Sequence, residues 1–233
     1  MEDMKIIKAI KLIGLYSLTF LLVACGGGGG GGTPTTPTDP NTVFSLFAPD
    51  YFTVGHSETT NLTGSDTLGG VYTGTFSAQT QPQTTFLGEA AIPIFGQLQL
   101  TNTANGAVLS SIGTVYWSTS AADRRQLGYS ESSSTTVSGT STAIPQTAMI
   151  NDFGAIGTYT DNAGNVDVDS WRLDDGGNGR AKIVELGTTE DQFGNLITSL
   201  TTITLIDTNG NSLSTTLVVY IASENATITL SGN

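Results

Sequence analysis

The sequence predicts an all-β fold, an antiparallel meander of about 10 to 11 strands that forms a barrel or a two-sheet sandwich. Three observations support it. From residue 41 onward, β-branched runs and apolar–polar alternation are common, and no stretch has the apolar period of a helix. The third is the pattern Asp-x-x-Gly-Asn, which occurs at residues 161–165, 191–195 and 207–211. Because Asp can cap a turn and Gly supplies the positive φ that closes it, this pattern predicts hairpins.

The N-terminus has the composition of an export signal. Lys5, Lys8 and Lys11 precede an uncharged and mostly apolar run at residues 12–24. A basic segment followed by a short apolar segment is typical of a signal peptide. The run is shorter than the roughly 20 residues that a helix needs to cross a bilayer. We therefore predict that residues 1–24 form a signal peptide and not a permanent transmembrane helix.

The end of this run, Leu22-Val23-Ala24-Cys25, resembles the lipobox of bacterial lipoproteins. The resemblance implies that Cys25 becomes the N-terminus and carries diacylglycerol on sulfur and an amide-linked acyl chain. Two or three acyl chains hold a protein firmly on a membrane, whereas one holds weakly. Gly26, where aspartate commonly implies retention at the inner membrane, favours the outer membrane and leaves open whether the protein faces the periplasm or the surface. The alternative is an ordinary signal peptide that leaves Cys25 as a free thiol.

Residues 25–42 cannot form a core. Seven glycines, residues 26–32, give flexible chain, and the Thr/Pro-rich segment that follows gives stiffer, extended chain. We expect the lipidated Cys25 and this segment to act as a tether for a single all-β domain at residues 43–233.

The charge of the predicted mature chain excludes one class of partner. Five cations remain after residue 24 against 18 Asp and Glu, a formal charge of −13. Nucleic-acid binding needs clustered Lys and Arg, so we expect no nucleic-acid partner. The same charge disfavours docking on anionic lipid head groups. The expected membrane contact is therefore the covalent lipid at Cys25, and any small-molecule or protein partner is unknown.

Turn sequences delimit the expected strands. In the C-terminal half the strands are expected near residues 154–160, 166–173, 180–187, 196–206, 212–222 and 226–230. In the N-terminal half they are expected near residues 70–78, 84–90, 97–101, 107–119 and 125–132, with 43–54 as a lead-in strand. Short loops between successive strands favour antiparallel neighbours, so the C-terminal half should be a six-strand meander.

The two halves of the domain share short similar strings. Residues 102–110 align with residues 207–214 with one deletion, and residues 71–73 resemble residues 158–160. Both an old internal duplication and convergence of Thr-rich hairpins would produce such strings. The fold could therefore consist of two related halves.

The sequence carries no recognisable catalytic motif. A Ser-His-acid triad would need its one histidine, His56, but the sequence has no Gly-x-Ser-x-Gly elbow to supply the serine. A packed or surface loop position is the simpler interpretation of His56. A single histidine and a single cysteine remove the usual zinc, copper and iron ligand sets. We therefore predict no enzyme activity, no catalytic residue and no cofactor.

Calcium is the one metal with candidate ligands. Asp161, Asn165, Asp167 and Asp169 bring oxygen atoms together within nine residues. The spacing is not that of an EF-hand, and Asp167 and Asp169 alternate on an expected strand, so both point to one face. Turn formation explains these residues without a metal, and the expected metal site is none.

Aromatic side chains could line a ligand pocket inside a small barrel, but most are expected to be core. The residues concerned are Tyr72, Phe76, Tyr116, Trp117, Tyr129, Tyr159, Trp171 and Tyr220.

Two stretches, residues 144–160 and Trp171-Arg172-Leu173, resemble β domains of uncharacterised proteobacterial lipoproteins that begin with a similar poly-Gly run. This resemblance implies no particular activity. The leading hypothesis is a lipid-anchored outer-membrane protein, structural or ligand-binding and not enzymatic. The alternative is a lipid-anchored hydrolase that cleaves envelope polysaccharide through paired carboxylates, which needs no histidine.

Overall fold

The computed structural model describes residues 36–131 and 135–233, which form β-strands and one short 3-10 helix, η2 (Ala222–Glu224). The predicted all-β class is confirmed. The strands are β1 (Val43–Ser45), β2 (Ser57–Asp66), β3 (Val71–Thr80), β4 (Thr84–Phe86), β5 (Glu89–Asn102), β6 (Val108–Ser118), β7 (Gln126–Glu131), β8 (Thr135–Ser141), β9 (Thr147–Met149), β10 (Phe153–Thr160), β11 (Val166–Gly177), β12 (Arg180–Glu190), β13 (Leu196–Ile206), β14 (Ser212–Ile221) and β15 (Ala226–Gly232).

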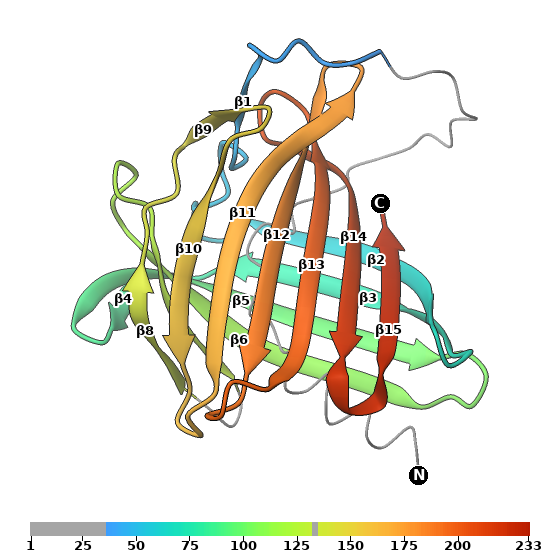
Figure 1. Ribbon diagram of the computed structural model, residues 1–233. Helices are drawn as coiled ribbons and strands as arrows, with labels where there is room; N and C mark the ends of the chain where they lie inside the picture. The colour runs from blue at the N-terminus through green and yellow to red at the C-terminus, as the bar shows by residue number, and fades with distance from the viewer. Residues whose placement is uncertain (1–35, 132–134) are drawn as a thin grey trace.

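Twelve strands form an antiparallel barrel (Figure 1). The ring runs β2-β3-β5-β6-β7-β8-β10-β11-β12-β13-β14-β15 and returns to β2, so each strand pairs with the next barrel strand along the chain. The β3–β5 pairing completes this ring, and the contact between β7 and β8 is only three residue pairs long. Strand β4 extends along β5 outside the ring, and β1 pairs with β9 in a separate small sheet. The barrel has one more strand than the upper end of the predicted range.

The ring is folded sharply, so that β2, β3, β5 and β6 cross the direction of β11–β14 (Figure 1). Two glycines permit the close strand contacts in this part of the ring. A Cβ atom on Gly64 would lie 1.9 Å from the Thr229 carbonyl oxygen, and one on Gly74 would lie 1.9 Å from that of Gln99. Glycine in a strand commonly marks such a bend or close backbone approach.

The predicted six-strand meander, β10 to β15, is present, and its Asp-x-x-Gly-Asn turns have one shared geometry. In each turn the Asp carboxylate accepts the backbone N–H groups of the residues two and four positions later. The Asn side chain also donates to that carboxylate. Gly164, Gly194 and Gly210 have φ of +85°, +80° and +83°. The predicted hairpin chemistry is therefore confirmed.

Large side chains fill the barrel. Of the eight aromatic residues singled out in the sequence, the buried ones are Tyr72, Phe76, Trp117, Tyr129, Tyr159 and Trp171. Tyr116 is only partly buried and belongs to a second, smaller cluster outside the barrel. The expectation that most of these aromatics are core is confirmed, and their burial is a main source of stability.

Residues 36–56 pack over one end of the barrel. The Thr36 N–H donates to Asn178 Oδ1 (3.0 Å), and the Thr38 hydroxyl donates to the Arg180 carbonyl (2.9 Å). Phe44 and Tyr51 are buried in the main core. Residues 36–42, which the sequence analysis assigns to the tether, therefore contact the turn between β11 and β12.

Strand β5 differs from the prediction. Residues 84–90 were expected to form one strand and residues 97–101 another, but a turn at Leu87-Gly88 separates β4 from a single β5. Pro93 lies inside β5 and has no N–H to donate. It is tolerated because the partner edge changes there from β4 to β3, with β4 pairing up to Ala91 and β3 beginning at Ile94.

The sequence analysis missed β2, β8 and β9, and only residues 43–45 of the expected lead-in strand are extended. Strand β2 has one aliphatic residue that faces the core, Leu62, so apolar alternation is weak. The aligned strings proposed for an internal duplication occupy different places in the two six-strand runs, β2–β8 and β10–β15. The duplication stays a hypothesis.

We predict that Gly210→Ala destabilises the domain more than Gly194→Ala. Both substitutions place a Cβ at positive φ, which costs on the order of 1 kcal/mol. At Gly210 the new Cβ would also lie 2.6 Å from the Phe47 carbonyl oxygen, whereas Gly194 has open space. Denaturant unfolding of the two variants measures the difference. Equal losses would show that residues 44–47 do not pack on this turn as described.

Candidate functional site

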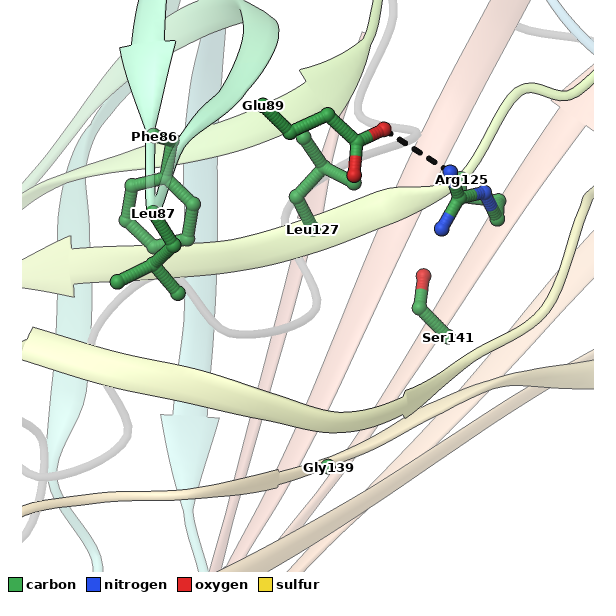
Figure 2. Close-up of a pocket in the computed structure, with 7 residues that line it drawn as sticks. All are labelled: Phe86, Leu87, Glu89, Arg125, Leu127, Gly139 and Ser141. Atoms are coloured by element: carbon green, nitrogen blue, oxygen red, sulfur yellow. Dashed lines mark hydrogen bonds and ion pairs between the residues drawn. The ribbon is translucent and has the colours of Figure 1, made fainter.

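The candidate site is a cavity of about 270 Å³ on the outer wall of the barrel, which we call the seam pocket (Figure 2). It is lined by Phe86, Leu87, Glu89, Arg125, Leu127, Gly139 and Ser141. These residues come from the β4–β5 hairpin, from the start of β7 and from β8. Apolar side chains line the hairpin side, and charged or hydroxyl groups line the remainder.

The hairpin that forms one wall is anchored by its own apolar cluster. Phe86, Ala91 and Leu127 are buried together, and the Phe86 and Tyr116 rings stack with centroids 4.1 Å apart. This cluster lies outside the main core, so the hairpin is held against the barrel independently of the barrel interior. The apolar wall of the pocket is therefore preformed.

Leu87 at the tip of this hairpin is strained and exposed. The two-residue turn Leu87-Gly88 has φ of +51° and +88°, and positive φ at both positions is the signature of a type I′ turn. Asn-Gly is the favoured sequence there, and a leucine in the left-handed region costs about 1 kcal/mol. Leu87 is nevertheless 61% exposed. The turn therefore holds an apolar side chain at the surface in a conformation that glycine or asparagine adopts more easily.

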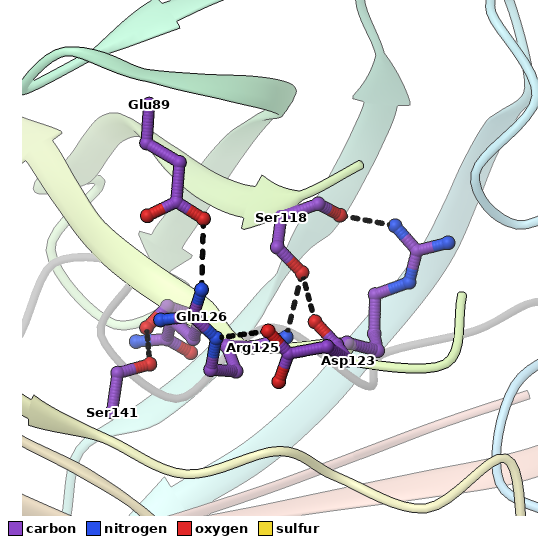
Figure 3. A network of polar contacts seen from close by, with 7 residues as sticks. Glu89, Ser118, Asp123, Arg125, Gln126 and Ser141 are labelled. Atoms are coloured by element: carbon purple, nitrogen blue, oxygen red, sulfur yellow. Dashed lines mark hydrogen bonds and ion pairs between the residues drawn. The ribbon is translucent and has the colours of Figure 1, made fainter. Parts of the chain in front are cut away.

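A polar network fixes the charged end of the pocket (Figure 3). Arg125 donates from Nη2 to Glu89 (2.9 Å) and from Nε to Asp123 (2.8 Å). The Ser118 hydroxyl accepts the Arg125 backbone N–H and donates to the Asp123 carbonyl. Both ends of Arg125, backbone and guanidinium, are therefore held in place.

The pocket lies where the barrel wall is least regular. The β7–β8 ladder ends at the pair Gly128 and Val137, and the next backbone bond between these segments runs from the Ile144 N–H to the Arg124 carbonyl. Between them, the hydroxyls of Ser141 and Tyr159 donate to the Gln126 carbonyl. Side-chain hydroxyls thus replace backbone pairing at this seam.

Sequence reasoning missed this site entirely. Its residues are spread from 86 to 141, and they come together only because β8 returns beside β7. One local signal was available, since Leu-Gly between two short β-branched or apolar runs is an unusual hairpin turn.

The barrel interior contains carboxylates that the sequence analysis had considered as calcium ligands. Asp167 and Asp169 both face inward from β11, as their spacing predicted, and Asp169 is only 3% exposed. Tyr129 and Thr189 donate hydrogen bonds to Asp167. Neither Asp169 oxygen has a hydrogen-bond partner among the described residues.

Burial disfavours the charged form of these groups. It raises the pKa of Asp169 well above its ordinary value, and the charge of Asp167 adds to this effect. Burial likewise raises the pKa of Glu131 to about 8, with contributions from Asp167 and Asp161. Burial raises the pKa of Asp167 too, although its hydrogen bonds from Thr189 and Tyr129 oppose the shift.

The other two calcium candidates serve a turn. Asp161 accepts hydrogen bonds from the Asn165 backbone and side chain, so both residues close the β10–β11 hairpin. Across the described residues, no three Asp, Glu, His or Cys side chains are grouped in a way that could hold a metal ion. The four candidates are divided between a surface turn and the barrel interior.

His56 is not among the residues that line the seam pocket, and it stands directly before β2. Its Nδ1 is 3.1 Å from Asp50 Oδ2, and its Nε2 contacts Glu58. Its ring also packs edge-on against Tyr51. This is the packed loop position that the sequence predicted.

Cys25 and the predicted signal peptide lie outside the described residues. Among residues 36–131 and 135–233, no helix is long and apolar enough to cross a membrane. Comparisons with protein-family models, curated proteins and solved structures found no match.

We predict that the domain loses stability as the pH rises. Glu131, Asp167 and Asp169 have folded-state pKa values above their ordinary values. At a pH between the ordinary pKa and the folded-state pKa of such a group, the folded chain binds more protons than the unfolded chain. For Glu131 this stabilisation is complete below pH 4.5 and is lost as the pH rises through about 8. The melting midpoint should fall by several degrees from about pH 5 to about pH 9.

The variant Glu131→Gln should reduce this fall, because its amide does not titrate. Glu190→Gln, which changes an exposed carboxylate at the end of β12, is the matched control for net charge. If both variants keep the full pH dependence, Glu131 does not cause it.

We also predict that Leu87→Asn stabilises the domain by about 1 kcal/mol, because asparagine tolerates positive φ at a type I′ turn. A gain of about 2–4 °C in melting midpoint is expected for a domain of this size. Leu68→Asn is the control, since Leu68 is similarly exposed in the β2–β3 turn but is not at positive φ. A loss of stability at Leu87 would mean that this side chain is part of the packed hairpin.

Proposed function

We propose that the protein is a lipid-anchored protein of the bacterial outer membrane that binds a ligand in the seam pocket and catalyses no reaction. The seam pocket carries the proposal, because it is a preformed cavity with an apolar wall and a few fixed polar groups, which is the usual make-up of a binding site. Its volume is near the lower limit for ligand pockets, so it suits a small molecule or one side chain of a larger partner.

The polar groups of the pocket are arranged for binding. The Ser141 hydroxyl donates to the Gln126 carbonyl, and Arg125 spans Glu89 and Asp123. Among the described residues no histidine lies near Ser141 to accept its proton, since His56 lies between Asp50 and Glu58. A nucleophile without a base is a poor catalyst, so these contacts favour recognition.

The carboxylate hydrolase remains the alternative. It needs two carboxylates that flank a substrate in an open cleft. Asp167 and Asp169 are deeply buried, and both Glu89 and Asp123 are held by the same guanidinium. Substrate cannot reach the buried pair, and the exposed pair is not free to act as separate acid and base groups. Ligand binding is therefore the better-supported function.

The anchoring part of the proposal predicts that Cys25→Ser releases the protein from the membrane. The variant should fractionate with soluble proteins and should no longer incorporate a labelled fatty acid. Its melting midpoint should be unchanged, because the sequence analysis assigns Cys25 to the tether and not to the all-β domain. Fatty-acid labelling that persists in the variant would contradict lipidation at Cys25.

The binding part predicts that filling the pocket abolishes ligand binding and leaves the fold intact. Gly139→Val puts a side chain into the cavity at a β8 position where the nearest obstacle is the Thr158 carbonyl, 3.3 Å from the new Cβ. Fragments found by NMR screening of the mature chain with Cys25→Ser should shift pocket resonances in that protein and not in the double variant. Thr229→Val, on the exposed face of β15, is the control. Fragments that bind equally well to all three proteins would exclude the pocket as the site.

A further inference from the structure

We infer that the seam pocket receives the side chain of a lysine or arginine from a partner protein. This inference rests on the proposed ligand binding and names its chemistry. It follows from the charge at the polar end of the pocket, from the length of the apolar wall and from the exposure of Leu87.

The charged groups of the pocket favour a cation. Among the lining residues Glu89 is negative and Arg125 is positive. Asp123, which is not a lining residue, binds the same guanidinium, so the three groups together have a charge of −1. Glu89 is 46% exposed, and only its Oε1 is engaged in an interaction with a described residue. Figure 2 shows its second oxygen on the side of the other lining residues. A carboxylate oxygen at the pocket is therefore available to an ammonium or guanidinium group.

An anionic ligand fits this site less well. Arg125 is the one cation among the described lining residues, and its guanidinium already binds two carboxylates of the same chain. An incoming carboxylate or phosphate would have to displace Glu89 or Asp123, and it would leave the displaced group without its partner. Burying or crowding an uncompensated charge is unfavourable.

The remaining lining matches the stem of a long basic side chain. Lys and Arg pack their methylene groups along apolar surface and keep the charged head near polar groups. Phe86, Leu87 and Leu127 provide such a surface next to Glu89.

Two features favour a protein as the source of this side chain over a small amine. The predicted mature chain has a formal charge of −13, which attracts a basic surface over a distance and speeds encounter. Leu87 projects at the hairpin tip and is mostly exposed, so the contact surface extends past the cavity. A small amine would cover only the surface inside the pocket, whereas a protein would also cover the exposed part of Leu87.

The first test uses three probes with the same apolar chain: n-hexylammonium, hexanol and hexanoate. They are titrated into the mature chain carrying Cys25→Ser and followed by NMR shifts of pocket residues. We expect hexylammonium to bind most tightly and hexanoate least. If hexanol or hexanoate binds as well as or better than hexylammonium, the inferred charge is wrong but the pocket remains a binding site. If no probe shifts the pocket resonances, both this inference and the proposed function fail.

Two variants should change the affinity for hexylammonium in opposite directions. Glu89→Gln removes the acceptor charge and should weaken hexylammonium binding about two- to fivefold. Arg125→Met leaves the pocket more negative and should strengthen it by a similar factor. Glu190→Gln is the control for net charge. Thermal melts confirm that each variant is folded, and equal hexylammonium affinity in Glu89→Gln and the unsubstituted protein would overturn the inference.

A second pair of probes tests the source. A capped peptide with one lysine between two leucines should bind more tightly than hexylammonium. The same peptide with norleucine in place of lysine should bind less tightly than the lysine peptide. Leu87→Asn should weaken binding of the lysine peptide more than binding of hexylammonium, because the peptide also covers the exposed part of Leu87. If Leu87→Asn has the same effect on both probes, or if hexylammonium is the tighter ligand, the partner is a small amine and not a protein.

Discussion

Closure of the twelve-strand ring is the constraint on which the rest of the structure depends. A twelve-strand barrel is wide, and an unfilled interior would lose packing energy along every wall. The ring is instead folded across glycines such as Gly64 and Gly74, where the neighbouring backbone leaves no room for a side chain. The walls therefore approach closely enough for Trp117, Tyr129 and Tyr159 to fill the space between them.

The same closure creates the candidate site. The β7–β8 ladder is the shortest in the described ring, because these strands pair over only three residues before their backbones diverge. Hydroxyl groups of Ser141 and Tyr159 bind the Gln126 carbonyl there, and the β4–β5 hairpin covers the outside of the seam. The pocket therefore forms where backbone pairing in the barrel wall stops, because the hairpin brings apolar side chains beside Arg125 and Glu89.

The interior also contains polar groups that burial does not favour. Asp167 retains hydrogen bonds from Tyr129 and Thr189, whereas the Asp169 oxygens have no partner among the described residues. Burial favours the protonated form of such carboxyl groups, so the stability of the barrel depends on pH. This coupling arises inside the barrel, whereas the carboxylates at the seam pocket, Glu89 and Asp123, are about half exposed at the outer wall.

The amino-acid sequence by itself determined the all-β class, the C-terminal meander and the chemistry of the Asp-x-x-Gly-Asn turns, because alternation and turn residues act between near neighbours. The predicted signal peptide and the lipidated Cys25 also rest on local motifs. Strands β2 and β8 escaped detection, since their stability comes from neighbours in the ring and not from their own apolar content. Only the tertiary structure brought Phe86, Arg125 and Ser141 together, because a contact between distant residues depends on which strands pair and in which register.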